Sequence, residues 1–88
     1  MARSWPNPFL DRVRLEFVLP AATTVGLEVF DVSGRSIRAY EPGLLAAGDH
    51  ILTWDGGSSD GRSAGHGIYF LRAAGPGITL SRTVVRLE

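Results

Sequence analysis

The sequence contains no cysteine and no lysine. Without cysteine there is no disulfide framework, so the fold must be held by its core and its hydrogen bonds. All nine basic residues are arginine, a bias that we attribute to the codon usage of a GC-rich genome, and they balance nine acidic residues to a formal net charge of zero. Because nucleic-acid-binding domains present an excess of basic charge, this balance argues against nucleic acid as a partner.

Long apolar runs and helical periodicity are missing as well. No run approaches the roughly 18 apolar residues that a membrane-spanning helix needs, and the start of the chain lacks the charged-then-apolar pattern of a signal peptide. If the natural protein is exported, its export signal is therefore expected upstream. A chain of 88 residues buries roughly 60–65% of its unfolded surface, which is enough for one core and one domain.

Glycine and proline are plentiful and divide the chain into short runs. Eleven glycines and five prolines separate segments in which apolar residues alternate with others, as in residues 13–19 before Pro20. Runs at a spacing of roughly 8–12 residues predict an all-β, immunoglobulin-like antiparallel β-sandwich of six to seven strands. The seventh strand depends on pairing of the N-terminal segment, and the other expected strands cover residues 13–19, 25–30, 35–40, 49–54, 68–73 and 78–87.

Two segments are expected to lie outside the strands. Residues 1–9 are interpreted as an extended N-terminal segment, because their prolines cannot donate to a ladder. Residues 10–88 are then the single sandwich domain. Residues 41–48 are an expected connection, whose Leu44 and Leu45 would cover one end of the core.

The clearest turn lies at residues 31–34. Asp31 can accept local backbone hydrogen bonds, and Gly34 can take the positive φ that closes a type I turn with a bulge. This turn would aim Arg35 back at Asp31 or at neighbouring carbonyls. Trp54 alternates with Leu52 in a later strand and is predicted to fill the core.

Several short motifs follow one another in order along the chain. They run from Asn-Pro-Phe near the start, through an Asp…Gly-Arg turn and a Trp-Asp-Gly strand end, to Gly-hydrophobic-Tyr and a closing strand with basic residues. This order resembles the C-terminal sorting domain of the type IX (Por) secretion system and its relative, the immunoglobulin-like domain of the flagellar hook-capping protein. The residues that carry the resemblance are Asn7, Pro8, Phe9, Asp31, Gly34, Arg35, Trp54, Asp55, Gly56, Gly67 and Tyr69.

The resemblance implies a non-catalytic C-terminal sorting and anchoring module. In that family the module directs an upstream cargo through the periplasm and outer membrane to the cell surface, where a sortase-like peptidase cuts upstream of the sandwich, here near or before Arg3-Ser4. The implied partners are the secretion machinery, that peptidase and the fused cargo, with no small-molecule substrate and no cofactor. The closing strand, as an edge with unpaired backbone groups, is expected to carry recognition through Arg82, Val84, Val85 and Arg86.

Two other functions stay open. Hook-cap domains share the turn and the Trp-Asp-Gly block, so the alternative is a structural module of a hook-cap-like or other extracellular multidomain protein. Sorting domains tend to carry Lys before the final strand, where this chain has Arg82, and the closing Leu87-Glu88 also departs from their pattern. The third hypothesis is a carbohydrate-binding accessory domain of a secreted hydrolase, in which Trp5 would stack on a sugar.

The long loop after the fourth expected strand holds the side chains with the most chemical potential. Ser58 or Ser59, His66 and an aspartate are the residue types of a nucleophilic triad, but the loop lacks a nucleophile elbow, and a solvated connection is the preferred interpretation. Asp55 and Asp60 offer a weak calcium alternative, although we expect both to cap turns. The sequence therefore predicts no catalytic residues and no metal site.

Overall fold

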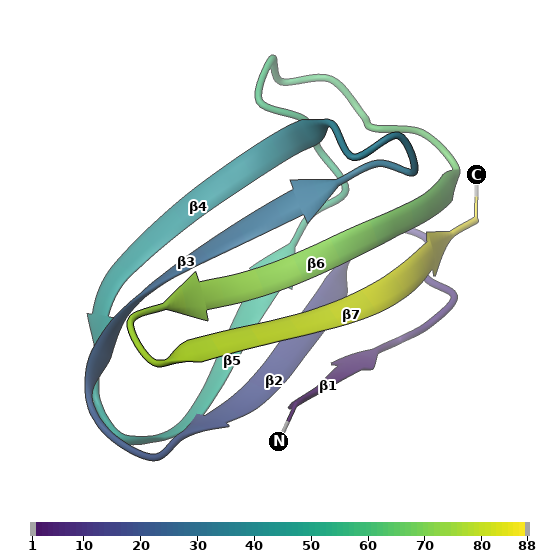
Figure 1. The fold of residues 1–88 in the computed structure, drawn as a ribbon. Coiled ribbons are helices and arrows are strands. Elements are labelled where there is room, and N and C mark those ends of the chain that lie inside the picture. The colour runs from purple at the N-terminus through teal and green to yellow at the C-terminus, as the bar shows by residue number, and fades with distance from the viewer. Residues whose placement is uncertain (1, 88) are drawn as a thin grey trace.

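The computed structural model describes residues 2–87, which form seven strands in two antiparallel sheets packed face to face (Figure 1). The three-stranded sheet has the order β1-β2-β5, and the four-stranded sheet has the order β4-β3-β6-β7. This architecture confirms the immunoglobulin-like sandwich. The described residues include no helix long and apolar enough to cross a membrane. The strands are β1 (Ala2–Trp5), β2 (Val13–Leu19), β3 (Thr23–Phe30), β4 (Ser36–Leu45), β5 (Gly48–Trp54), β6 (Gly67–Gly75) and β7 (Ile78–Arg86).

Period-2 alternation in β2 and β3 builds much of the core. Every second side chain from Val13 to Leu19 and from Val25 to Val29 points between the sheets and is at most 2% exposed, because successive side chains of a strand face opposite ways. Each large side chain buried in this way contributes roughly 1.5–3 kcal/mol, which stabilises the sandwich without a disulfide. The fully buried side chains are Trp54, Phe9, Phe17, Leu15, Leu19, Leu27, Leu71, Val13, Val25, Val29 and Val84.

Trp54, the last residue of β5, belongs to this core, as the alternation of β5 predicts. Its side chain is fully buried, and its ring meets Phe9 edge-on at 5.6 Å and Tyr69 edge-on at 4.9 Å between centroids. The indole Nε1 donates a 2.8 Å hydrogen bond to the Gly57 carbonyl. The one polar atom of the ring is therefore satisfied, so the burial carries no desolvation penalty.

The turn at residues 31–34 has the predicted geometry. The Gly34 amide donates to the Asp31 carbonyl at 3.0 Å, and Gly34 has a φ of 87°, which an L side chain adopts only under strain. Asp31 Oδ1 accepts hydrogen bonds from the amides of Ser33 and Arg35. The Arg35 Nε lies 3.3 Å from Asp31 Oδ2, which confirms that the turn aims Arg35 back at this carboxylate.

The expected connection at residues 41–48 is wrong, because most of it is strand. β4 continues to Leu45, and β5 starts at Gly48. Pro42 is tolerated because β4 is the edge strand of its sheet and because it lies in a bulge of β4, where Glu41 and Pro42 stand opposite Gly26 of β3. Leu45 packs against the core, whereas Leu44 is 74% exposed and covers nothing.

The N-terminal segment pairs and so supplies the conditional seventh strand, which makes it part of the sandwich rather than a segment ahead of it. β1 pairs with β2 along its whole length, with Ala2 opposite Phe17 and Trp5 opposite Arg14. This pairing is possible because Ala2–Trp5 precedes the first proline and keeps all its amide donors. Further along the segment, Phe9 is 1% exposed and belongs to the core.

Candidate functional site

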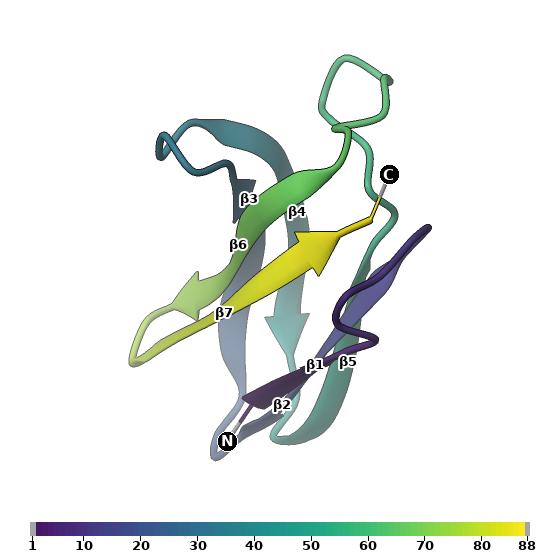
Figure 2. The same cartoon turned by 90° about the vertical axis from the view of Figure 1, so that its right-hand side faces the viewer.

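The Asn-Pro-Phe motif lies against the C-terminal half of β7. Asn7 Nδ2 donates to the Thr83 carbonyl at 3.1 Å, and Asn7 Oδ1 accepts from the Val85 amide at 2.9 Å. The Phe9 amide donates to the Val85 carbonyl at 2.9 Å, and the Phe9 carbonyl accepts from the Leu87 amide at 2.8 Å. This arrangement, which we name the terminal clasp, joins the two ends of the fold; Figure 2 shows the purple N-terminal strand and the yellow β7 on the same side of the sandwich.

Arg86 extends the terminal clasp to the β5–β6 loop. Its Nε donates to the Leu10 carbonyl at 3.0 Å, and its Nη1 donates to the Gly56 carbonyl at 2.6 Å. The guanidinium carbon lies 6.0 Å from the centroid of the Phe9 ring, within cation–π range. A side chain at residue 56 would overlap with this guanidinium, and Gly56 has a φ of 79°. The glycine of the Trp-Asp-Gly motif is therefore required by both backbone conformation and space.

Arg82 makes a second link between the ends of the chain. Its Nη2 donates to the Ala2 carbonyl in β1, and its Nη1 donates to the Ser81 carbonyl at 2.8 Å. Both cationic side chains that were expected to meet an external receptor thus hold carbonyls of this chain.

The expected free edge of β7 needs correction for the same reason. The backbone groups of Val85 are occupied by Asn7 and Phe9, and the Val84 side chain is fully buried in the core. A partner that binds the folded domain can therefore contact neither the Val84 side chain nor the backbone groups of Val85. The outward side chains of β7 are the part of this strand that stays accessible.

The β5–β6 loop covers the opposite edge of the same sheet. The Ser59 amide donates to the Ile37 carbonyl of β4 at 2.8 Å. Asp55 Oδ1 accepts from the Gly57 amide at 2.9 Å and lies 3.7 Å from Arg38 Nη1. The loop is thus fixed over the edge of β4 rather than free in solvent.

Tyr69 of the Gly-hydrophobic-Tyr motif supports this loop from the core side. Its hydroxyl donates to the Ala64 carbonyl at 2.5 Å and to the Gly65 carbonyl at 3.0 Å. Burial raises the pKa of the Tyr69 hydroxyl above its usual value, which keeps it a donor. Gly67, with a φ of 139°, provides the bend between the loop and β6, so the motif is explained by loop support.

The loop residues do not assemble a triad. The Ser58 hydroxyl donates to Asp60, and the Ser59 hydroxyl donates to the Ile37 carbonyl. In the described part of the chain, His66 is exposed and is not a partner of either serine. The predicted solvated connection is thus closer to the structure than a nucleophilic site, except that Ser59 fastens it to β4.

Both loop aspartates cap turns, as expected. Asp60 Oδ1 accepts from the Arg62 amide at 3.0 Å and from the Ser58 hydroxyl. The Ser58 bond, followed by the Arg62 amide, lowers the pKa of Asp60 below its usual value. Asp55 caps its turn because its Oδ1 accepts a hydrogen bond from the Gly57 amide. Among the described residues there is no group of three or more His, Asp or Glu side chains arranged to hold a metal ion, so the calcium alternative gains no support.

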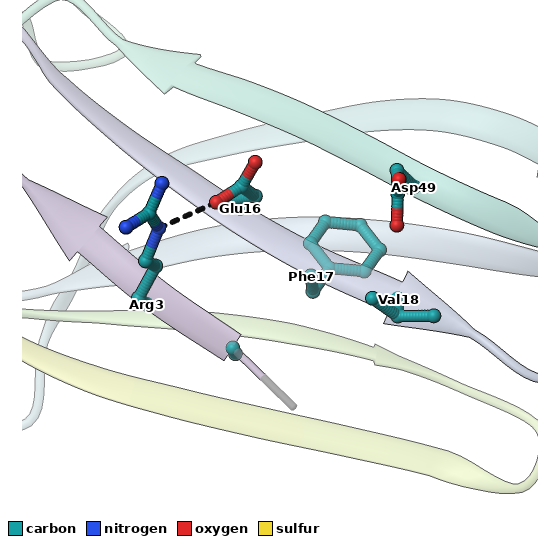
Figure 3. A pocket seen from close by; sticks show the side chains of 6 residues that line it. Arg3, Glu16, Phe17, Val18 and Asp49 are labelled. Carbon is teal, nitrogen blue, oxygen red and sulfur yellow. Dashed lines mark hydrogen bonds and ion pairs between the residues drawn. The ribbon is translucent and has the colours of Figure 1, made fainter.

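A shallow hollow of about 230 Å³ lies where β1, β2 and β5 meet (Figure 3). The Arg3 guanidinium bonds Glu16 at 2.5 Å across its rim, Asp49 stands on the far side, and Phe17 lines it (Figure 3). Arg3 also lies over the Trp5 ring at 4.8 Å, which leaves one fewer ring face for a sugar. The hollow pairs Arg3 with Glu16 and brings together no nucleophile and base.

Comparison with known sequences finds similarity to FlgD proteins. The model of the FlgD Ig-like domain matches residues 11–76. The basal-body rod modification protein FlgD of Salmonella typhimurium is 42% identical over 48 residues, which cover 54% of this chain and 21% of that protein. The FlgD of Escherichia coli K12 is 41% identical over 49 residues, covering 56% and 21%. The chain thus spans about a fifth of the curated relatives that it matches.

Solved structures give a second set of similar proteins. Dimeric latent PorU from Porphyromonas gingivalis superposes with a TM-score of 0.79 at 18% identity, over 98% of this chain and 9% of that one. FlgD from P. aeruginosa gives 0.70 at 27% identity, over 85% and 58%. PorZ, a surface component of the type IX secretion system of P. gingivalis, gives 0.68 at 16% identity, over 99% and 11%. Because the family model spans more than half of the residues, the chain belongs to the FlgD Ig-like domain family.

Proposed function

We propose that the chain is a non-catalytic sorting and anchoring module that directs an upstream cargo through the type IX secretion system to the cell surface. The observation that carries the proposal is the extent of the structural similarity. PorU and PorZ match 98% and 99% of the chain, and these shares include the strands joined by the terminal clasp. By contrast, the family model ends at residue 76, before β7 begins, and FlgD from P. aeruginosa covers only 85% of the chain.

The position of β1 refines where a surface peptidase would cut. Arg3 and Ser4 pair with Glu16 and Leu15 of β2, whereas a peptidase binds its substrate as an unpaired extended segment. Cutting at Arg3-Ser4 would require β1 to leave the sheet. The bond attacked therefore lies before Ala2 in the proposed role, in chain that links the cargo to the sandwich.

Export of a reporter tests the proposal. A reporter fused ahead of the chain should become accessible to added protease on intact type IX-competent cells, and should stay inside cells whose type IX system is disabled. Charge reversal at Arg82 or Arg86 would break the bonds to the carbonyls of Ala2, Leu10 and Gly56. Loss of export in such variants could result from unfolding of the domain as well as from loss of recognition.

Substituting lysine at outward positions of β7 tests recognition of this strand by the secretion machinery without disturbing the fold. Thr79 and Ser81 are exposed, so Thr79→Lys with Ser81→Lys changes the surface and leaves the core intact. The matched control places lysines at Ile51 and Thr53 on the outward side of β5, which are also exposed. Loss of surface delivery in the β7 variant alone supports recognition through β7. A reporter retained by the unmodified fusion in competent cells would reject the sorting role.

The second candidate is a structural module of a hook-cap-like or other extracellular multidomain protein. It is favoured by the family match over residues 11–76 and by the 42% identity to FlgD. Complementation separates the two candidates. If the chain replaces the corresponding domain of a flagellar FlgD with motility retained, while the reporter fails to reach the surface, the structural role is supported.

A further inference from the structure

The outer face of the four-stranded sheet has an unusual composition. We define it as the outward side chains of β3, β6 and β7, three strands that lie side by side in the sheet (Figure 1). Apart from Glu28 and Arg72, these positions hold only Gly, Ala, Ser, Thr, Val, Ile and Phe. The outward side of β1 and β2 instead carries Arg3, Arg14 and Glu16. Depletion of charge with exposed aromatic residues is the signature of the centre of a protein interface.

Two apolar rows cross this outer face. Phe30 of β3 lies opposite Phe70 of β6, and Ile68 of β6 lies opposite Val85 of β7. Phe70 is 38% exposed and Ile68 is 45% exposed. The pairs are adjacent along β6, so they form one continuous patch rather than scattered apolar residues.

The two charged residues on the outward sides of β3 and β6 form a cross-strand pair, as Phe30 and Phe70 do. Glu28 of β3 lies opposite Arg72 of β6, with 3.8 Å between Arg72 Nη2 and Glu28 Oε1. The Arg72 guanidinium carbon lies 5.1 Å from the centroid of the Phe30 ring. In both cross-strand pairs one member belongs to β3 and the other to β6.

We propose that this outer face binds a second copy of the chain. In the dimer a two-fold axis runs parallel to the strands between β3 and β6, so that β3 of one copy faces β6 of the other across about 10 Å. Phe30 of each copy then packs on Phe70 of the other, and Glu28 of each faces Arg72 of the other. A two-fold interface requires such a self-complementary surface, and this inference does not depend on the proposed export role.

The size of the face sets the expected strength. An axis between β3 and β6 also places β4 of one copy opposite β7 of the other, and four strands about 4.8 Å apart and about 30 Å long present roughly 500 Å². A dimer would therefore bury about 1,000 Å² in total, at the lower limit of specific interfaces. The expected dimer is weak and depends on concentration, and the burial of the two Phe pairs contributes most of its stability.

Reciprocal charge reversal tests the arrangement. Sedimentation equilibrium of the 88-residue chain should show a monomer–dimer equilibrium below about 1 mM. Glu28→Arg makes both charged positions positive, and Arg72→Glu makes both negative, so each variant alone should dimerise at least tenfold more weakly. When the two variants are mixed, every cross-copy pair again has opposite charges. Labelled Glu28→Arg chain should then bind unlabelled Arg72→Glu chain about as tightly as the unmodified chain binds itself.

The controls separate association from folding. Each variant should keep its strand circular dichroism, and Arg14→Glu, on the outward side of β2, should leave the dimer unchanged. A chain that stays monomeric at about 1 mM would overturn the proposal and assign the patch to another protein or to a neighbouring domain of a longer polypeptide. Failure of the mixed variants to associate, with dimerisation of the unmodified chain retained, would overturn the proposed axis between β3 and β6.

Discussion

Replacing Arg86 with methionine tests whether the terminal clasp stabilises the fold. Methionine keeps an apolar stem and removes the donors to the carbonyls of Leu10 and Gly56. Hydrogen bonds from a charged donor contribute about 1.5–3 kcal/mol each, and partial exposure places these near the lower end. We therefore expect Arg86→Met to lower the free energy of unfolding by about 3 kcal/mol, out of roughly 4–13 kcal/mol for a domain of this length.

Urea denaturation followed by the fluorescence of Trp5 and Trp54 measures this loss. With an m-value near 1 kcal/mol/M, the midpoint should fall by about 2–3 M. Arg12→Met, at an exposed arginine, is the control and should change the free energy by no more than about 0.5 kcal/mol. An equally small change for Arg86→Met would mean that water replaces the guanidinium at both carbonyls, and that the clasp is not held by Arg86.

A double-mutant cycle extends this prediction to Gly56. Gly56→Ala should destabilise the fold, because the new methyl group overlaps with the Arg86 guanidinium and the residue has a positive φ. In the Arg86→Met background only the backbone cost of about 1–2 kcal/mol should remain. Strictly additive losses would contradict direct contact between these positions.

Three further predictions concern the core, the β3–β4 turn and acid stability. Trp54→Ala should lower the free energy of unfolding by roughly 3–5 kcal/mol, and near-unchanged stability in urea would contradict its burial. Gly34→Ala should destabilise by about 1 kcal/mol because its φ is 87°, whereas Gly26→Ala, which meets only an ordinary contact at 3.7 Å, should be milder; equal effects would reject the turn. Hydrogen bonds from Ser33 lower the pKa of Asp31 below 3.8, so its stabilisation is present above that pH and is lost as the pH falls through the folded pKa. The stability gap between the unmodified chain and Asp31→Asn should therefore shrink in acid, and a constant gap would contradict this role.

The fold was largely predictable because its strongest signals are local. Alternation in β2 and β3 depends only on the period of two along a strand, and the turn at Asp31 and Gly34 depends on the chemistry of adjacent residues. The predicted end of β4 at residue 40 was wrong because a proline such as Pro42 usually ends a strand. The edge position that tolerates Pro42 is a property of the whole sheet.

The candidate site was less predictable because it consists of contacts between distant residues. The motif positions Asn7, Phe9 and Gly56 were identified from the resemblance, but nothing local shows that they meet β7. Arg86 was assigned to external recognition since a strand pattern does not reveal which cation is used internally. The outer-face patch has a local signal, because Phe30 and Phe70 stand on the polar side of their alternations, but two single aromatic residues do not show that they are neighbours in the sheet.

The terminal clasp also fixes the order in which the molecule can be completed during synthesis. Asn7 bonds residues that lie 76 and 78 positions later in the chain, and the ribosome releases those residues after strands β1 to β6. Contacts of such long sequence separation form slowly, and domains made N-terminus first wait for their missing partners. The sandwich therefore stays open until residues 83–87 have emerged. A polypeptide interrupted within β7 loses the anchorage of its first residues together with its final strand.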